Sequence, residues 1–132
     1  MTPQHIYTIF QQAFGQNVWE EKSFMETIEN CDCLANEMGA VLYRTTARET
    51  EILNLAVLPS EMGKGVGTGL ILSLIEDVID ATDKIFLEVA KDNHSAIALY
   101  DKCGFKQIAV REKYYSRIGS EKVDALIMSF QA

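Results

Sequence analysis

The chain has 132 residues, 48% of them hydrophobic, and its formal net charge is −7. This length and apolar content can bury one sizeable core but are short for two, so we expect a single domain over residues 1–132. The acidic balance lacks the broad basic surface that nonspecific nucleic-acid binding needs, which argues against nucleic acid as a partner.

The amino-terminal stretch has no basic patch followed by an apolar run, and no apolar run approaches the roughly 20 residues that cross a bilayer. We therefore expect a soluble, cytoplasmic protein without a membrane partner. Cys31, Cys33 and Cys103 are an odd number, so we expect free thiols rather than a disulfide framework. His5 and His94 add no ligand-like spacing to these cysteines, and we expect no metal site.

Two helices are predicted first, because apolar side chains recur at helical spacing over residues 4–14 and 20–29. Three short extended segments follow and form an antiparallel meander: 32–37, 40–46 and 51–57. A tight turn at Met38 and Gly39 joins the first two of these segments.

The second half of the chain alternates helices with strands. Its periodicity predicts a helix over about 67–81, a strand over 84–90, a helix from a cap at Asp92 or Asn93 through Lys102, and strands over 105–115 and 123–130. Gly104 suits the left-handed position that ends the second of these helices.

This order of elements predicts an α/β fold with a mixed sheet of about six strands flanked by about four helices. The first three strands are joined as hairpins, whereas helices connect later strands that can run parallel. The sheet therefore cannot be purely parallel or purely antiparallel.

Four of the eight glycines stand at every second position from Gly63 to Gly69, within "VLPSEMGKGVGTGL". A glycine-rich turn between a strand and a helix offers exposed amides at the positive end of a helix dipole, which suits a phosphate. The alternative is a flexible loop, but glycine costs roughly 1 kcal/mol per helical position relative to alanine. Lys64 is followed by Gly65 rather than serine or threonine, which excludes a nucleotide P-loop, and the glycine spacing does not fit a dinucleotide fingerprint.

Two longer stretches carry a family resemblance. "LNLAVLPSEMGKGVGTGLI" and "FLEVAKDNHSAIALYDKCGF" resemble the acetyl-coenzyme A (acetyl-CoA) binding motifs of the GNAT acetyltransferases. More narrowly, "NHSAIALYDKCGF", "REKYY" and "DALIM" resemble the bacterial ribosomal-protein-alanine N-acetyltransferases, which modify protein amino termini. The resemblance implies a GNAT-like splayed sheet whose first strand is short or absent. It also implies acetyl-CoA as cosubstrate and a protein amino terminus as acceptor, with a ribosomal protein as one candidate.

The resemblance also implies which residues bind the cofactor. Backbone groups of Leu55 and Val57 are expected to pair with the pantetheine arm, and Asn93 is expected near that arm. The pyrophosphate is expected against the main chain of the glycine segment: Met62, Gly63, Lys64, Gly65, Val66, Gly67 and Thr68. Met62 stands where the family commonly has glutamine or arginine, so we expect weaker cofactor affinity than in the family.

Two residues are candidates for the proton transfers. Glu88 interrupts the apolar strand "IFLEVA", and the resemblance implies that it accepts the proton of the amine; the alternative is a solvent-facing glutamate. Tyr100 matches by position the family's general acid, which returns a proton to the thiolate, although it could be an aromatic residue at the core edge. The amide of Val57 is the expected donor to the carbonyl oxygen.

The acceptor is predicted from chemistry and resemblance together. An α-amine costs roughly 1.4 kcal/mol to neutralise at pH 7, against about 4.6 kcal/mol for lysine, so one glutamate suits an α-amine better. Tyr114 and Tyr115 resemble the family's tyrosine pair at the acceptor site; the alternative for them is simple packing. Two other functions stay open: an acetyltransferase for a small amine or antibiotic, and a noncatalytic acyl-CoA sensor. The sequence makes no prediction of oligomeric state.

Overall fold

The structure, a computed structural model, describes residues 1–15, 20–115 and 123–131, with side chains throughout these ranges except at 113–115. Four α-helices lie in this part of the chain: α1 (Pro3–Phe14), α2 (Glu21–Glu29), α3 (Val66–Val78) and α4 (His94–Lys102). The strands are β1 (Asp32–Ala35), β2 (Gly39–Thr46), β3 (Glu49–Val57), β4 (Lys84–Ala90), β5 (Lys106–Tyr115) and β6 (Val123–Gln131). A short 3-10 helix, η2 (Pro59–Glu61), precedes α3 and was not predicted from the sequence.

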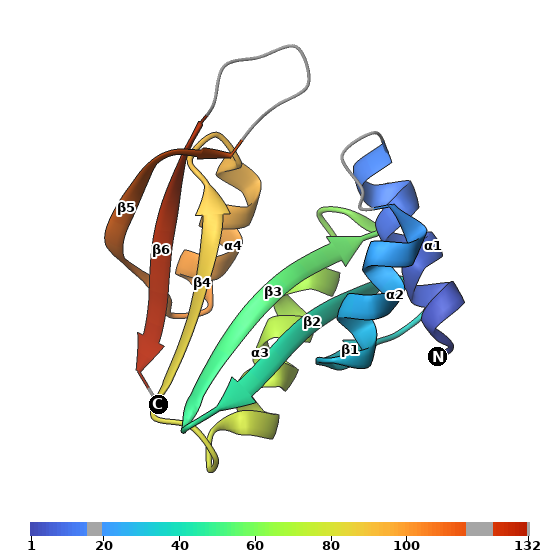
Figure 1. Cartoon of the computed structure of the whole chain (residues 1–132). Helices are drawn as coiled ribbons and strands as arrows, with labels where there is room; N and C mark the ends of the chain where they lie inside the picture. Colours follow the sequence, from blue (N-terminus) through green and yellow to red (C-terminus); the bar gives the residue numbers. More distant parts are fainter. Residues whose placement is uncertain (16–19, 116–122, 132) are drawn as a thin grey trace.

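The six strands form one mixed sheet in the order β1-β2-β3-β4-β6-β5. Only β3 and β4 pair in parallel, because α3 connects them, and the other neighbours are antiparallel. Helices α3 and α4 cover one face of the sheet, whereas α1 and α2 lie on the other face over β1 to β3 (Figure 1). This arrangement confirms the predicted mixed α/β fold.

Strands β3 and β4 are paired over only part of their length. Their register runs from Glu49 opposite Lys84 to Ile52 opposite Leu87 and then ends. Beyond this point β3 pairs with β2 alone and β4 with β6 alone, and the two strands diverge in Figure 1. The sheet is therefore splayed, as the resemblance implied.

A bulge in β3 coincides with the point where the two strands part. Leu42 lies opposite Asn54 and Tyr43 lies opposite Ile52, so Leu53 is an extra residue on β3. An extra residue bends its strand and increases the local twist. We attribute the divergence of β3 from β4 to this bend.

The opposite, closed end of the splay is held by buried hydroxyl groups. Thr50 on β3 is fully buried, and its hydroxyl lies 3.2 Å from that of Thr82, just before β4. The Thr82 hydroxyl also lies 3.1 Å from the carbonyl oxygen of Arg48. Because unsatisfied buried hydroxyls are costly, this network favours the registered end of the two strands.

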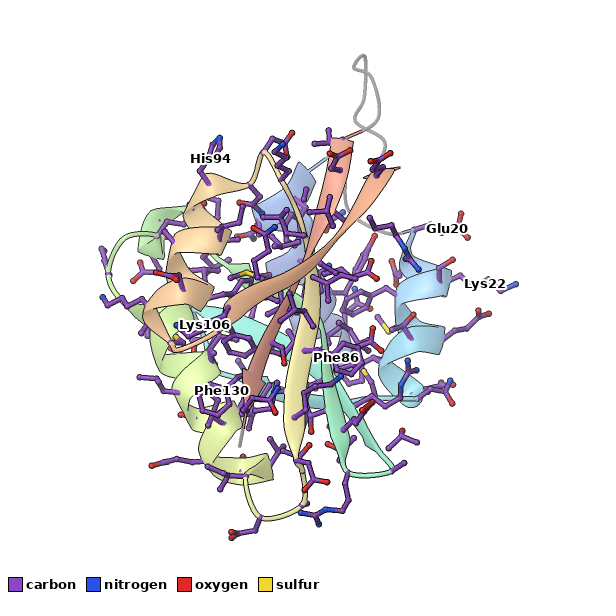
Figure 2. The ribbon with its side chains drawn as sticks, turned by 90° about the vertical axis from the view of Figure 1, so that its left-hand side faces the viewer. Glu20, Lys22, Phe86, His94, Lys106 and Phe130 are labelled. Atoms are coloured by element: carbon purple, nitrogen blue, oxygen red, sulfur yellow. The ribbon has the colours of Figure 1, made fainter. Side chains whose placement is uncertain are left out.

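The two faces of β4 differ in what covers them. Ile85, Leu87 and Val89 are buried against α3 and α4, whereas Phe86 and Glu88 are half-buried on the other face. Figure 2 shows Phe86 on the side of the sheet toward α2, and Phe130 on the side toward α3 and α4. The face of β4, β6 and β5 that bears Glu88 is called the open face below.

Element boundaries differ from the predictions by a few residues. The predicted helix over 67–81 begins at Val66 and ends at Val78, after which Ala81 closes a turn by donating to the carbonyl of Val78 at 2.9 Å. The first strand ends at Ala35, because the Asn36 side chain accepts from the amides of Met38 and Gly39 and starts the turn there. None of the described helices is long and apolar enough to cross a membrane.

Candidate active site

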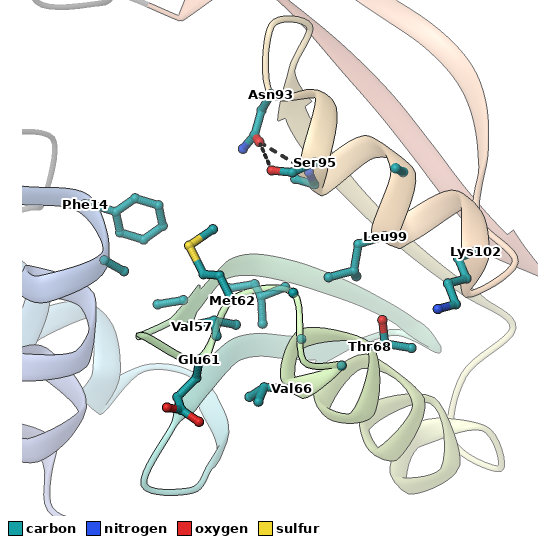
Figure 3. A pocket seen from close by; sticks show the side chains of 18 residues that line it. Phe14, Val57, Glu61, Met62, Val66, Thr68, Asn93, Ser95, Leu99 and Lys102 are labelled. Atoms are coloured by element: carbon teal, nitrogen blue, oxygen red, sulfur yellow. Dashed lines mark hydrogen bonds between the residues drawn. The ribbon is translucent and has the colours of Figure 1, made fainter. Parts of the chain in front are cut away.

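A cavity of about 470 Å³ lies beside the splay, between the end of β3, the start of α3 and one face of α4 (Figure 3). All but one of the residues that the sequence assigned to the cofactor line this cavity. They are Leu55, Val57, Met62, Gly63, Gly65, Val66, Gly67, Thr68 and Asn93. The structure thus brings together residues that are up to 38 positions apart in the chain, from Leu55 to Asn93.

The start of α3 forms one wall of the cavity and presents backbone donors. Gly65 precedes the helix in a left-handed conformation, and no side chain in the described residues caps this helix end. The first intrahelical bond is donated by the amide of Gly69 to the carbonyl of Gly65, at 2.9 Å. The amides of Val66, Gly67 and Thr68 precede that bond, so they lack intrahelical acceptors. Together with the helix dipole, they make a site for an anion.

The alternating glycines have different structural causes, which corrects the single explanation given from the sequence. Gly63 and Gly65 have φ values of +78° and +85°, which L-residues with side chains rarely adopt. At Gly67 a Cβ atom would lie 2.6 Å from Leu99 Cδ1, so this glycine lets α3 approach α4 closely. A Cβ at Gly69 would meet nothing within 4 Å, and nothing in the structure explains a glycine there.

Lys64 is the predicted cofactor residue that does not line the cavity. Its ammonium group lies 3.6 Å from the Glu61 carboxylate, and its side chain is 62% exposed. Met62 lines the cavity, but its exposed thioether cannot supply the charge of the arginine common in the family.

Lys102 lines the cavity, although the sequence analysis did not assign it to the cofactor site. It lies at the end of α4, and in Figure 3 its amine points toward Thr68 at the start of α3. Ser95, Leu99 and Lys102 stand at positions i, i+4 and i+7 of one helical stripe, and all three line the cavity. In the sequence, this helical spacing after the cap residue Asn93 could have indicated that Lys102 faces the same side as Ser95.

Asn93 has two structural roles. Its Oδ1 atom caps α4 by accepting from the Ala96 amide at 3.3 Å, and it accepts from the Ser95 hydroxyl at the same distance. Capping fixes the side chain at the rim of the cavity. The sequence prediction of a cap at Asp92 or Asn93 is therefore confirmed, with Asn93 as the cap.

The register of β2 and β3 determines where the backbone of β3 points. The amide of Leu58 donates to the carbonyl of Met38 at 2.8 Å. From this pair onward, hydrogen-bonded and non-hydrogen-bonded residue pairs alternate along the two antiparallel strands. By this alternation Leu55 and Val57 direct their N–H and C=O groups away from β2, toward the gap. The Leu55 amide donates to Oδ1 of Asn54 at 2.9 Å.

Glu88 lies on the open face of β4, one residue beyond the last β3 partner. Its side chain is 25% exposed, and Nη1 of Arg111 lies 3.1 Å from Oε1 and 3.3 Å from Oε2. A carboxylate at this place can accept a proton from a group that approaches the gap from the open face.

Tyr100 lies on the opposite side of the sheet from Glu88. It is 6% exposed on α4, and its ring meets that of Phe105 edge-on, with centroids 5.7 Å apart. Neither Glu88 nor Tyr100 is among the residues that line the cavity. Tyr114 and Tyr115 are the last residues of β5, and their side chains lie outside the described residues.

The three cysteines are free, as predicted. Burial, with the neighbouring Cys31 as a second cause, raises the pKa of the Cys33 thiol to about 11. Burial also raises the pKa of Cys103. These thiols are thus poor nucleophiles at neutral pH. Within residues 1–15, 20–115 and 123–131, no group of three or more His, Cys, Asp or Glu side chains could hold a metal ion.

Comparison with known proteins places this chain in a family. The family model described as acetyltransferase (GNAT) family matches residues 5–105. A [ribosomal protein bS18]-alanine N-acetyltransferase of Haemophilus influenzae is 30% identical over 136 residues, which cover 96% of this chain and 90% of that protein. An uncharacterised protein of Mycobacterium leprae is 33% identical over 129 residues, but the chain spans only 34% of its length.

The fold is similar to solved structures as well. The crystal structure of the ribosomal-protein-S18-alanine N-acetyltransferase from Escherichia coli superimposes with a TM-score of 0.87 at 28% sequence identity. The match covers 98% of this chain and 86% of that one. The family match, the splayed mixed sheet and the uncapped start of α3 agree with one another. The chain belongs to the GNAT family of acetyltransferases.

Proposed function

We propose that the chain transfers the acetyl group of acetyl-CoA to the α-amine of a protein amino terminus, with a ribosomal protein as the candidate acceptor. The names of relatives similar over most of the chain support this acceptor class. The observation that carries the proposal is the gap between β3 and β4. A cavity with free helix-start amides adjoins it on one side, and Glu88 borders it on the other.

The cavity residues fit the binding of a coenzyme A molecule. The amides of Val66, Gly67 and Thr68 would hold the pyrophosphate, as anions are held at helix starts. The backbone of Leu55 and Val57 would pair with the pantetheine amides as a neighbouring strand would, because these groups point away from β2. Binding would require the Asn54 side chain to release the Leu55 amide if the ligand uses that donor.

When bound, acetyl-CoA supplies the thioester whose carbonyl carbon the amine attacks; the C–N bond forms and the C–S bond breaks. Glu88 accepts the proton that the amine loses, directly or through a water molecule. The Val57 amide donates a hydrogen bond to the carbonyl oxygen as charge develops there. Tyr100 gives a proton to the departing thiolate and regains one from solvent, so the balance closes.

Mass spectrometry of a peptide panel after incubation with acetyl-CoA tests this proposal. The panel varies the first residue, includes alanine, and pairs each peptide with a copy whose amino terminus is blocked but whose internal lysine is free. We expect one acetyl group on peptides with a free amino terminus and none on the blocked copies. Acetylation of small amines with all peptides unmodified would favour a small-molecule acceptor. Coenzyme binding without any acetyl transfer would favour a sensor.

Glu88→Gln tests the role of the carboxylate within this proposal. We expect kcat to fall by about 10²- to 10⁴-fold, the usual contribution of a general base. Glu51→Gln is the matched control, since Glu51 is also a half-exposed, arginine-paired glutamate, opposite Phe86 on the same face. An unchanged kcat for Glu88→Gln would remove Glu88 from the mechanism.

A further inference from the structure

Arg111 and Glu88 interact across an intervening strand. Glu88 is on β4 and Arg111 is on β5, and β6 lies between them. Neighbouring strands lie about 4.8 Å apart, so the two backbones are about 10 Å apart. A contact of 3.1 Å between their side chains therefore requires the long arginine to extend along the sheet.

The strand registers place this contact on the open face. Arg111 and Ala90 both lie opposite Ala125 of β6, so these three residues share one face. Glu88 is two residues before Ala90 and shares that face as well. Arg111 lies opposite Ala125 and Glu88 lies opposite Ile127, so the arginine crosses β6 diagonally between these two residues, starting beside the small, fully buried side chain of Ala125. A small side chain there leaves room for the arginine to cross β6.

We infer that Arg111 is a positioning residue that orients the Glu88 carboxylate toward the gap between β3 and β4. This inference rests on the proposed role of Glu88 as the base. One guanidinium nitrogen, Nη1, lies within 3.3 Å of both carboxylate oxygens, so this charged contact restrains the position of the carboxyl group. The arginine acts through Glu88.

A positioning role for Arg111 differs in its energetic effect from simple stabilisation of the fold. Arg111 is half exposed, and exposed ion pairs contribute little to folding stability. Orientation of a base, by contrast, has a large effect on rate, because a misplacement of about 1 Å can cost roughly 10²-fold. We therefore expect Arg111 variants to fold normally and to lose turnover.

The experiment measures steady-state kinetics with acetyl-CoA and an amino-terminal peptide for wild type, Arg111→Gln, Arg111→Lys, Glu88→Gln and the double variant Arg111→Gln/Glu88→Gln. We expect Arg111→Gln to lower kcat by about 10- to 100-fold, with the KM for acetyl-CoA and the thermal midpoint nearly unchanged. Arg111→Lys should recover part of the loss, since it keeps the charge without the planar group. In the Glu88→Gln background, Arg111→Gln should cause no further loss. The matched control is Arg44→Gln, which removes the partner of Glu51 and should leave kcat unchanged.

Three results would overturn the inference. The first is a wild-type kcat in Arg111→Gln when Glu88→Gln is inactive. The second is a fall in kcat from Arg111→Gln that is as large in the Glu88→Gln background as in the wild type, and the third is a loss of acetyl-CoA binding in Arg111→Gln that accompanies its loss of kcat. Unchanged kcat in Glu88→Gln would contradict the proposed function of Glu88 and this inference together. The first result would contradict the inference alone, which separates the two failures.

Discussion

Two lysines near the cavity differ in their surroundings, and this difference separates their roles. Lys64 belongs to the glycine segment but is directed to Glu61 and to solvent. Lys102 comes from α4, lines the cavity and points toward Thr68 in Figure 3. Because Met62 supplies no charge, we expect Lys102 to provide a cation for a phosphate of the coenzyme.

Calorimetry of coenzyme A binding at low salt distinguishes the two lysines. Lys102→Gln should weaken binding by about tenfold, which corresponds to about 1.4 kcal/mol and is typical of a hydrogen bond to a charged group. The matched variant Lys64→Gln should change the dissociation constant by less than about twofold, as exposed pairs do. A larger loss for Lys64→Gln than for Lys102→Gln would contradict this assignment.

At the scale of single residues, the sequence predicted on which face of a strand a side chain lies better than it predicted which side chains contact one another. Strict alternation along "KIFLEVA" puts Glu88 and Phe86 on one face of the strand and Ile85 and Leu87 on the other, and the structure has this arrangement. The contact between Glu88 and Arg111 could not be predicted, because it depends on a strand order in which β6 lies between β4 and β5. Likewise, Lys102 resembles any basic residue at a helix end until α4 is placed against α3.

At the scale of elements, the start of α3 combines two requirements. The loop before it needs glycine for positive φ values, and the first helical turn needs a glycine where α4 packs. Gly67 is the helical glycine that packs against α4, where it faces Leu99. Gly69 answers neither, and its amide already donates to Gly65. The two helical glycines should therefore respond differently to substitution.

Gly69→Ala should stabilise the protein more than Gly67→Ala. Alanine is favoured over glycine by about 1 kcal/mol inside a helix, which would raise the thermal midpoint of Gly69→Ala by about 4 °C. In Gly67→Ala the gain is reduced, because the end of the Leu99 side chain must move from a Cβ placed 2.6 Å from its Cδ1 atom. Thermal unfolding of both variants checks this. A midpoint for Gly67→Ala that equals or exceeds that of Gly69→Ala would contradict the packing argument.

The point where β3 and β4 stop pairing could not be predicted from the sequence of the two strands. Nothing in the residue type of Leu53 marks it as the extra residue of a bulge, since leucine fits an ordinary strand equally well. The splay was expected only through the family resemblance. Periodicity alone predicted the strands along the chain, but neither their order in the sheet nor the point where their pairing stops.

At the scale of the whole molecule, the helix layer keeps the divided sheet together. One core cluster joins residues from β2 and β3 with residues from β4 and β6, beneath α3 and α4. A second cluster fixes α1 and α2 on the other face of β2 and β3. The strands can therefore separate at one end while the closed end and the helices hold the two halves in place.

The proposed function uses two different environments, one on each side of the point where β3 and β4 stop pairing. On the helix side lies a cavity whose wall offers backbone amides to an anion, and on the open face lies Glu88 with Arg111. In the proposed function, the acyl carrier runs from the cavity toward the open face where β3 and β4 diverge. The central claim is that coenzyme A binds along this path.

The most direct test is a crystal structure of the protein with coenzyme A. The account predicts pyrophosphate oxygens about 2.9 Å from the amides of Val66, Gly67 and Thr68, a usual hydrogen-bond length. It also predicts the pantetheine arm between β3 and β4, with the thiol in the gap beside Glu88. A coenzyme bound elsewhere on the molecule, or an arm that does not enter the gap, would contradict it.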